Sequence, residues 1–172
     1  MKSTLIALVE DKPGVLNRVA SLFRRRAFNI ESLTVGHTEQ PGVSRMTIVV
    51  DSARTDVRKV AQNLYKLVNV IQVEDVTERP AVIRDLALIK VRTNGNTRAE
   101  VLQIVETFRA RVVDVGLKTL MVEVTGTEEK IDGLVEVLGS FGIVEMVRTG
   151  RVAMVRGGNG NNGKSQYRVK GE

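Results

Sequence analysis

Residues 4–23, TLIALVEDKPGVLNRVASLF, contain a strand pattern, a turn and a helix pattern in direct succession. The stretch opens with an uninterrupted apolar run, which predicts a strand covered on at least one face. The turn DKPG contains proline and glycine, the two residues that interrupt regular structure most strongly. After the turn, apolar residues recur at helical spacing, namely Val15, Leu16, Val19, Leu22 and Phe23. The stretch therefore predicts a β-strand followed at once by an amphipathic helix.

The next fifty or so residues continue this alternation of strands and helices. NIESLTVG (29–36) and SRMTIVVD (44–51) predict two strands joined by a polar turn. A helix follows around Val57, Val60, Ala61, Leu64 and Leu67, and VNVIQVEDV (68–76) predicts a fourth strand. The resulting order, β-α-β-β-α-β, is that of the ferredoxin-like fold.

The same order then repeats. The second set consists of LALIKV (86–91), a helix at 98–109, RVVDVG (111–116), TLMVEVTG (119–126), a helix at 127–139, and one closing strand, IVEMVRTGRVAM (143–154). The predicted fold class is therefore α+β, with two ferredoxin-like βαββαβ domains in tandem. We predict a first domain at 1–76, a linker at 77–83 around Pro80, a second domain at 84–155 and a flexible basic tail at 156–172.

The positive net charge is concentrated at the end of the chain. The whole sequence carries +6, of which residues 148–172 contribute +5. GGNGNNGKS (157–165) has no apolar period, so this segment predicts a solvated tail rather than an ordered nucleic-acid-binding arm. A second basic group, Arg24, Arg25 and Arg26, ends the first helix pattern. Cations favour the negative C-terminal end of a helix dipole, and this role is preferred over phosphate binding.

Composition argues against several function classes. The chain has no cysteine, and His37 is its only histidine, so neither a metal cluster nor a histidine-based catalytic dyad is expected. The aromatic residues fall on helix patterns, at strand edges and in the tail, so the base-stacking platform of RNA-recognition domains is missing. No apolar stretch approaches the roughly 18 residues of a membrane helix. We expect a cytoplasmic protein that binds neither nucleic acid nor membranes.

The turn that opens the chain has the outline of an amino-acid site. Pro13 suits the first position of a helix, and Gly14 has no side chain to cover the first-turn amides. The N–H groups around Gly14, Val15 and Leu16 would then attract a carboxylate, helped by the helix dipole. Asn29, at the start of the second strand, offers an amide oxygen to an ammonium group. From the residues alone, a plain strand–helix turn remains the alternative.

Longer stretches carry a family resemblance. LVEDKPGVLNRVASLFRRRAFNIESLTVG (8–36) resembles the opening of an ACT domain, an amino-acid-binding βαββαβ module. Together with RDLALIKV (84–91), RVVDVG and GTEEKIDGLVEVLGSFGIVEMVRTGRVAM (126–154), the chain resembles the regulatory, small subunits of acetolactate synthase, also called acetohydroxyacid synthase. The similarity runs in order through roughly residues 2–155, leaving out only the tail.

This resemblance implies a regulatory role without catalysis by the chain itself. In the family, a separate large subunit carries thiamine diphosphate, Mg²⁺ and FAD and condenses two 2-oxoacids in branched-chain amino-acid synthesis. The small subunit raises that activity and confers feedback inhibition, usually by valine. Effectors bind between the ACT domains of a homodimer, which transfers to this chain as a site made of Asp11, Gly14, Val15, Leu16, Asn29 and Ile30. Many members have Asn in place of Asp11, whose charge would oppose an effector carboxylate.

Two other functions are alternatives to a regulatory subunit. A free-standing amino-acid-responsive transcription regulator could use the same module, but it needs a DNA-reading helix-turn-helix, and the pattern has no surplus helix for one. An independent enzyme is the third possibility and lacks any catalytic constellation.

Overall fold

The computed structural model describes residues 2–53 and 56–157. The chain forms two compact units. Unit 1 contains the described residues up to Val82 together with residues 151–157, and unit 2 contains Ile83–Gly150. Each unit has two helices packed on an antiparallel sheet, which confirms the prediction of an α+β fold with two ferredoxin-like βαββαβ units.

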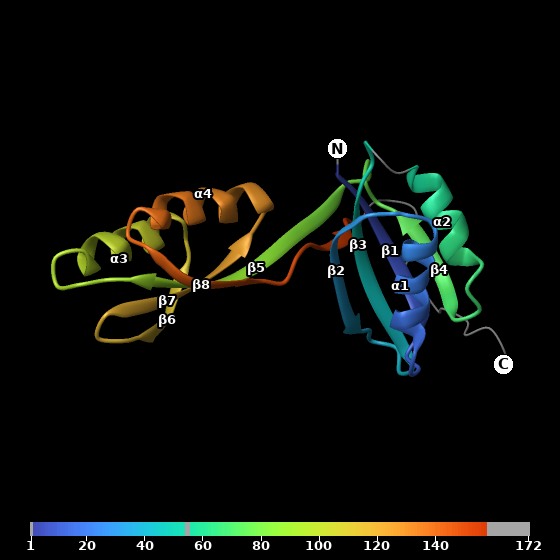
Figure 1. Cartoon of the computed structure of the whole chain (residues 1–172), viewed down its shortest axis with the longest axis horizontal. Helices are drawn as coiled ribbons and strands as arrows, with labels where there is room; N and C mark the ends of the chain where they lie inside the picture. Colours follow the sequence, from blue (N-terminus) through green and yellow to red (C-terminus); the bar gives the residue numbers. More distant parts are fainter. Residues whose placement is uncertain (1, 54–55, 158–172) are drawn as a thin grey trace. The chain divides into compact units, whose positions relative to one another are not determined.

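Unit 1 follows the predicted order of elements (Figure 1). Its elements are β1 (Lys2–Glu10), α1 (Val15–Arg25), β2 (Ile30–His37), β3 (Val43–Asp51), α2 (Val57–Tyr65) and β4 (Val70–Asp75). The strands lie in the order β2-β3-β1-β4, with β2 and β4 at the two edges. Alternate residues of β1, among them Leu5 and Val9, join the apolar faces of both helices in one core. Full burial of each such side chain contributes about 1.5–3 kcal/mol.

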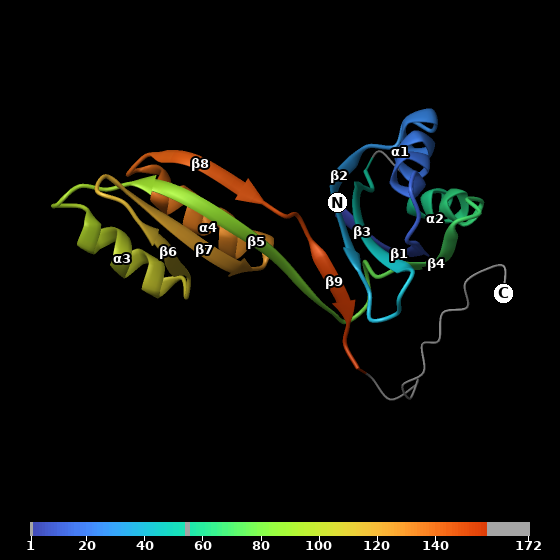
Figure 2. The same ribbon diagram turned by 90° about the horizontal axis from the view of Figure 1, so that it is seen from below.

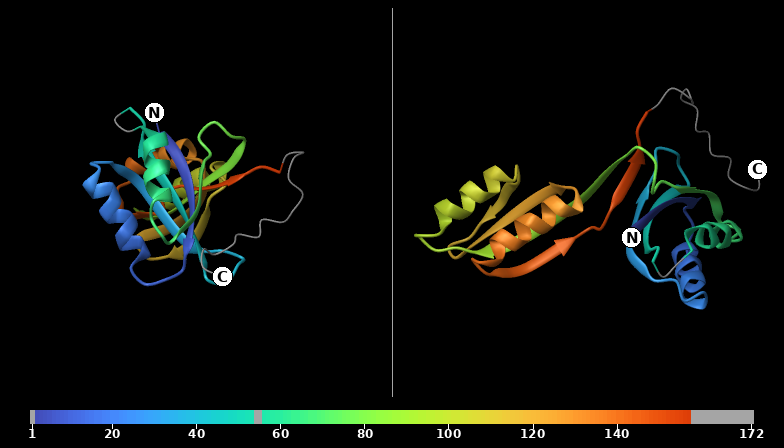
Figure 3. Two further views of the ribbon diagram at one scale, coloured as in Figure 1. Left: turned by 90° about the vertical axis from the view of Figure 1, so that its right-hand side faces the viewer. Right: turned by 90° about the horizontal axis from the view of Figure 1, so that it is seen from above.

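The face of the unit 1 sheet opposite the helices is also covered. Ile6 and Leu8 point away from the helix-side residues of β1 and are nonetheless 3% exposed. The cover includes β9 (Val152–Val155), which lies on this face in Figure 3. The guanidinium of Arg45 on β3 donates to the carbonyl oxygen of Ala153 at 2.7 Å. Arg151 similarly donates to Oγ1 of Thr4 at 3.1 Å.

The predicted single closing strand at 143–154 is wrong, because the structure divides it into β8 (Ile143–Arg148) and β9. Gly150 has φ +80°, a left-handed conformation that breaks an extended ladder. The residues after this break belong to unit 1, whereas the sequence pattern had assigned residues up to 155 to the second domain. β9 pairs with β5 (Ala81–Arg92), which begins inside the stretch 77–83 assigned to a linker.

Unit 2 repeats the topology with its own core. Its sheet has the order β6-β7-β5-β8, as Figure 2 shows. The remaining elements are α3 (Arg98–Thr107), β6 (Arg111–Val115), β7 (Thr119–Gly126) and α4 (Glu128–Gly139). Both helices lie on one face of this sheet, where Ile89, Val122 and Leu134 are fully buried. Most of the predicted tail, from residue 158 onward, lies outside the described residues. In the part that the structure describes, no helix is long and apolar enough to cross a membrane.

Candidate functional site

The loop between β1 and α1 ends at a residue with a left-handed backbone conformation, which glycine adopts without strain. The helix begins at Val15, so Pro13 lies in the preceding turn, and its predicted place at the first helical position is wrong. Gly14 is the N-cap residue, with φ +82° and ψ −5°. Side chains other than those of Asn and Asp rarely adopt this left-handed region. A Cβ atom at Gly14 would meet no other atom within 4 Å, so the space above the turn is open.

Two backbone donors in the first turn of α1 have no acceptor within residues 2–53 and 56–157. The amide of Val15 donates to the carbonyl of Lys12 at 3.3 Å, and that of Arg18 to Gly14 at 3.0 Å. No acceptor among the described residues meets the amides of Leu16 and Asn17, and Gly14 supplies no capping side chain. Such amides at the positive end of a helix dipole attract a carboxylate. The donors are therefore those of Leu16 and Asn17, whereas the sequence analysis had included Val15.

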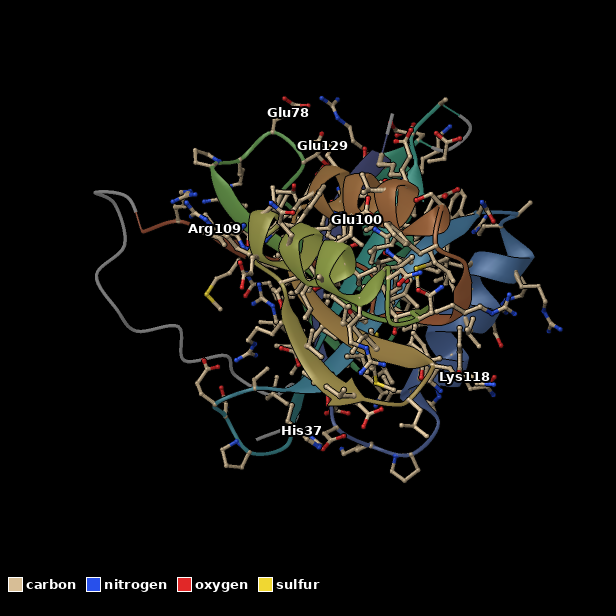
Figure 4. The ribbon with its side chains drawn as sticks, turned by 90° about the vertical axis from the view of Figure 1, so that its left-hand side faces the viewer. His37, Glu78, Glu100, Arg109, Lys118 and Glu129 are labelled. Carbon is tan, nitrogen blue, oxygen red and sulfur yellow. The ribbon has the colours of Figure 1, made fainter. Side chains whose placement is uncertain are left out.

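Asp11 is held at the entrance of this turn. Its backbone amide donates to the carbonyl of Gly42 at 2.8 Å. Its carboxylate oxygen Oδ2 lies 3.3 Å from Nδ1 of His37 at the end of β2, and Figure 4 labels this histidine. The two side chains are 85% and 45% exposed, so solvent weakens the interaction between them.

A polar network behind the turn fixes its two ends. The side-chain amide of Asn69 donates to Oε2 of Glu10, the last residue of β1, and its oxygen accepts from the Arg18 guanidinium at 2.6 Å. The hydrogen bond from Asn69, and secondarily the nearby Lys12 ammonium, hold the pKa of Glu10 below its ordinary value despite burial. Sequence reasoning missed Asn69, because this residue follows the second helix and carries no local signal of a role at the first turn.

The other predicted half of the site lies elsewhere in the same unit. Asn29 precedes β2, and its side-chain amide donates to Oε1 of Glu31 at 3.0 Å. Ile30 is the first residue of β2 and pairs with Val50 on β3, whereas His37 at the other end pairs with Ser44. Adjacent to Ser44, Val43 is also the partner of the last residue of β1.

This register separates the two halves of the predicted site. Seven steps of about 3.3 Å along β2 place Ile30 roughly 23 Å from the His37 end, where the β1–α1 loop lies. One chain therefore brings Asp11, Gly14, Val15 and Leu16 together, and leaves Asn29 and Ile30 at the opposite end of β2.

The equivalent loop of unit 2 is held by its own side chains. Between β5 and α3, Oδ1 of Asn94 accepts from the backbone amides of Asn96 at 2.9 Å and Thr97 at 3.0 Å. The Arg98 guanidinium then ties the start of α3 to the carbonyl of Gly116 at 2.7 Å. The amides of Ala99 and Glu100 in the first turn of α3 have no acceptor among the described residues, as in the first turn of α1. The two equivalent loops therefore differ in their side chains, because Gly14 leaves the turn of unit 1 without one.

Comparisons with known proteins match both units. A family model described as the small subunit of acetolactate synthase matches residues 84–157, and a model of the AHAS small subunit-like ACT domain matches residues 5–72. The chain belongs to the family of acetolactate synthase small subunits. The resemblance drawn from the sequence is thereby confirmed, and the rival interpretation as a transcription regulator is not favoured.

Individual acetolactate synthase small subunits agree with the family models. The chain is 50% identical over 157 residues to the probable acetolactate synthase small subunit of Archaeoglobus fulgidus, covering 91% of this chain and 98% of that protein. It is 52% identical to the acetolactate synthase small subunit of Mycobacterium leprae, covering 91% and 93%. The crystal structure of the acetolactate synthase small subunit from Thermotoga maritima superimposes with a TM-score of 0.85 at 38% identity, covering 92% of this chain and 99% of that one.

Proposed function

We propose that this chain, in the cytoplasm, activates the catalytic large subunit of acetolactate synthase and makes it sensitive to feedback inhibition by branched-chain amino acids, with valine as the principal effector. Family membership supports the catalytic partner. The observation that carries the effector site is the open first turn of α1, where the amides of Leu16 and Asn17 have no acceptor in the described chain.

The site would be completed by a second copy of the chain. β2 is an edge strand, so one side of its backbone is available for pairing. Antiparallel pairing of two β2 strands about a two-fold axis places Ile30 of each copy opposite His37 of the other. The Asn29–Ile30 end of one copy would then face the β1–α1 loop of its partner. A homodimer through the ACT domains therefore joins two half-sites that lie apart in each chain.

The chemistry of the joined halves suits a branched-chain amino acid. The Leu16 and Asn17 amides would bind the carboxylate, and the carboxylate of Asp11 and the side-chain oxygen of Asn29 would accept from the ammonium group. Leu16 is 47% exposed and would contact the aliphatic side chain, while the buried Val15 lines the floor. Ile30 of the partner copy would close the other side. A single methylene changes binding by only about 1–3 kcal/mol in such a pocket, so preference among effectors would be graded.

Cofactor chemistry would reside in the partner. Thiamine diphosphate, Mg²⁺ and FAD are proposed for the large subunit alone, with none held by this chain. Within residues 2–53 and 56–157, no three or more aspartate, glutamate or histidine side chains gather as a metal site. The chain's own contribution would be a coupling free energy between the effector site and the partner, typically about 1–3 kcal/mol.

Reconstitution with the large subunit tests this function. The purified chain alone should form no acetolactate from pyruvate, whereas its addition to the large subunit should raise turnover several-fold. Valine, leucine or isoleucine should then inhibit the complex but not the isolated large subunit. Acetolactate formation by the small chain alone, or activation without any effector response, would contradict the proposal.

A further inference from the structure

A cleft in unit 1 lies between the C-terminal parts of α1 and α2, away from the β1–α1 loop. It has a volume of about 400 Å³ and is lined by Leu22, Arg25, Arg26, Asn63, Lys66 and Leu67. Its apolar residues form the floor of the cleft, because Leu22 is 6% exposed and Leu67 is half-buried against the core. Its cations are exposed. An apolar floor with a charged rim is the usual anatomy of a protein interface.

The cations of this cleft have no acidic partner in the part of the chain that the structure describes. Among the described residues, Arg24, Arg25, Arg26 and Lys66 form no ion pair, although cations elsewhere do, as Arg79 does with Glu74 and Arg148 with Asp132. Their positions near helix C-termini satisfy the helix dipoles, which accounts for each cation separately. The helix dipoles do not neutralise the combined positive field of the three cations that border the cleft, to which the neighbouring Arg24 adds.

The unpaired cations indicate that the binding partner of the cleft is anionic. The two helix ends indicate that this partner is an extended surface and not a compact ion. Clustered guanidinium and ammonium groups without acidic neighbours favour an anionic partner. A compact phosphate-like ligand prefers helix N-termini, where backbone amides add donors. Here the two helix ends present carbonyl oxygens instead, which repel an anion placed deep in the cleft. Carboxylates carried on an extended protein surface can meet the outer ends of the long side chains without approaching those carbonyls.

We propose that this basic cleft, bordered by Arg25, Arg26 and Lys66, is a docking site for an acidic surface of the catalytic large subunit. This proposal rests on the proposed function, which supplies the partner. The charges steer association, while Leu22 and Leu67 provide the apolar centre of the contact. The site is separate from the effector turn, so docking and effector binding can be disrupted independently.

Association kinetics with the purified large subunit test the cleft. The cleft variant carries Arg25→Gln, Arg26→Gln and Lys66→Gln. The matched control carries Arg58→Gln, Lys118→Gln and Arg156→Gln, three exposed cations outside the cleft that form no ion pair in the described chain. Both variants lose three positive charges. At about 50 mM salt the association rate constant of the cleft variant should fall about tenfold or more, and the difference should shrink at high salt. The control should stay within about twofold of the parent chain.

The outcomes separate this proposal from the proposed function. Equal slowing of both variants would show non-specific steering by net charge, and unchanged association of the cleft variant would show that the large subunit docks elsewhere. Either result overturns the docking site while activation by the parent chain still stands. Tight binding of inorganic tripolyphosphate that requires the three cleft cations and leaves the docking rate unchanged would instead assign the cleft to a phosphate ligand. Failure of the parent chain to bind the large subunit at all would overturn both proposals. Melting temperatures within a few degrees of the parent confirm that each variant folds.

Discussion

The side-chain amide of Asn69 donates a hydrogen bond of 2.5 Å to Oε2 of Glu10, joining the turn before β4 to the end of β1. The backbone repeats the connection, since the amide of Glu10 donates to the carbonyl of Asn69 at 2.9 Å. Through its oxygen, Asn69 also holds Arg18 on α1. The turn proposed to bind the effector carboxylate thus lies between Glu10 and Arg18, which both hydrogen-bond to Asn69.

Replacement of this anchor should weaken effector binding. Asn69→Ala removes the hydrogen bonds to Glu10 and Arg18, so the β1–α1 loop should move more freely and the effector should bind several-fold more weakly by isothermal titration. Asn63→Ala is the control, because within the described residues the Asn63 side chain donates to the carbonyl of Lys59 in its own helix. Equal effects of the two substitutions on effector affinity would show that Asn69 has no specific role at the turn.

The acid response should depend on Glu10. Its pKa in the folded chain lies below the ordinary value of 4.5, so the ionised group stabilises the fold above that pH. This contribution is lost as pH falls from 4.5 through the folded pKa. Glu10→Gln should therefore lower the melting temperature at neutral pH, and the difference from the parent chain should narrow in acid. Glu39→Gln, which removes the same charge at an exposed position, is the control.

Charge at position 14 should control feedback inhibition. With φ at +82°, any side chain costs stability there, but Asn and Asp tolerate this region best. Gly14→Asp and Gly14→Asn should therefore lower the melting temperature by similar amounts. Only the aspartate places a negative charge over the Leu16 and Asn17 amides. Because charge-assisted hydrogen bonds contribute about 1.5–3 kcal/mol each, effector affinity should fall at least about tenfold in Gly14→Asp.

Activation of the large subunit should survive in both Gly14 variants. Comparable loss of inhibition in Gly14→Asn and Gly14→Asp would point to backbone strain as the cause, and retained inhibition with unaltered affinity in Gly14→Asp would mean that the turn holds no ligand.

The proposed site also predicts the binding stoichiometry. Because the site needs the turn before α1 and the Asn29–Ile30 end of a partner copy, titration should detect one effector site per chain. Asn94→Ala removes hydrogen bonds from the turn before α3, so it should destabilise that turn by about 0.5–1.5 kcal/mol per bond and leave effector affinity in unit 1 unchanged. Two equivalent sites per chain in the parent protein would contradict this assignment.

The end of the chain should be dispensable. Deletion of residues 157–172 removes a segment without any apolar pattern, so dimerisation, activation and inhibition should remain nearly unchanged at physiological salt. The strand β9 and Arg156, whose amide donates to the carbonyl of Pro80, stay in place. Loss of large-subunit binding in the truncated chain would identify the basic end as an interaction arm.

The sequence by itself determined the order of strands and helices in both units. Apolar spacing is a local property, and here the local preferences agree with the fold, from the run before Glu10 to the helical face of Val15, Val19 and Phe23. The glycine at the end of the β1–α1 turn was visible in the sequence, but its left-handed conformation is a finding of the structure. Family resemblance then identified nearly the whole chain, beyond this one turn.

Only the tertiary structure decided which segments, distant in the sequence, lie against one another. The strand 152–155 covers the unit 1 sheet, because Gly150 redirects the chain after β8, and no periodicity marks such a change of partner. Asn69 meets Glu10 through the pairing of β4 with β1, a long-range contact that local patterns do not contain. The distance between the β1–α1 loop and Ile30 follows from strand register, which depends on side-chain packing across β2 and β3. The β1–α1 loop and Asn29–Ile30 lie apart in one chain. Whether they form one site therefore depends on how two copies of the chain pair.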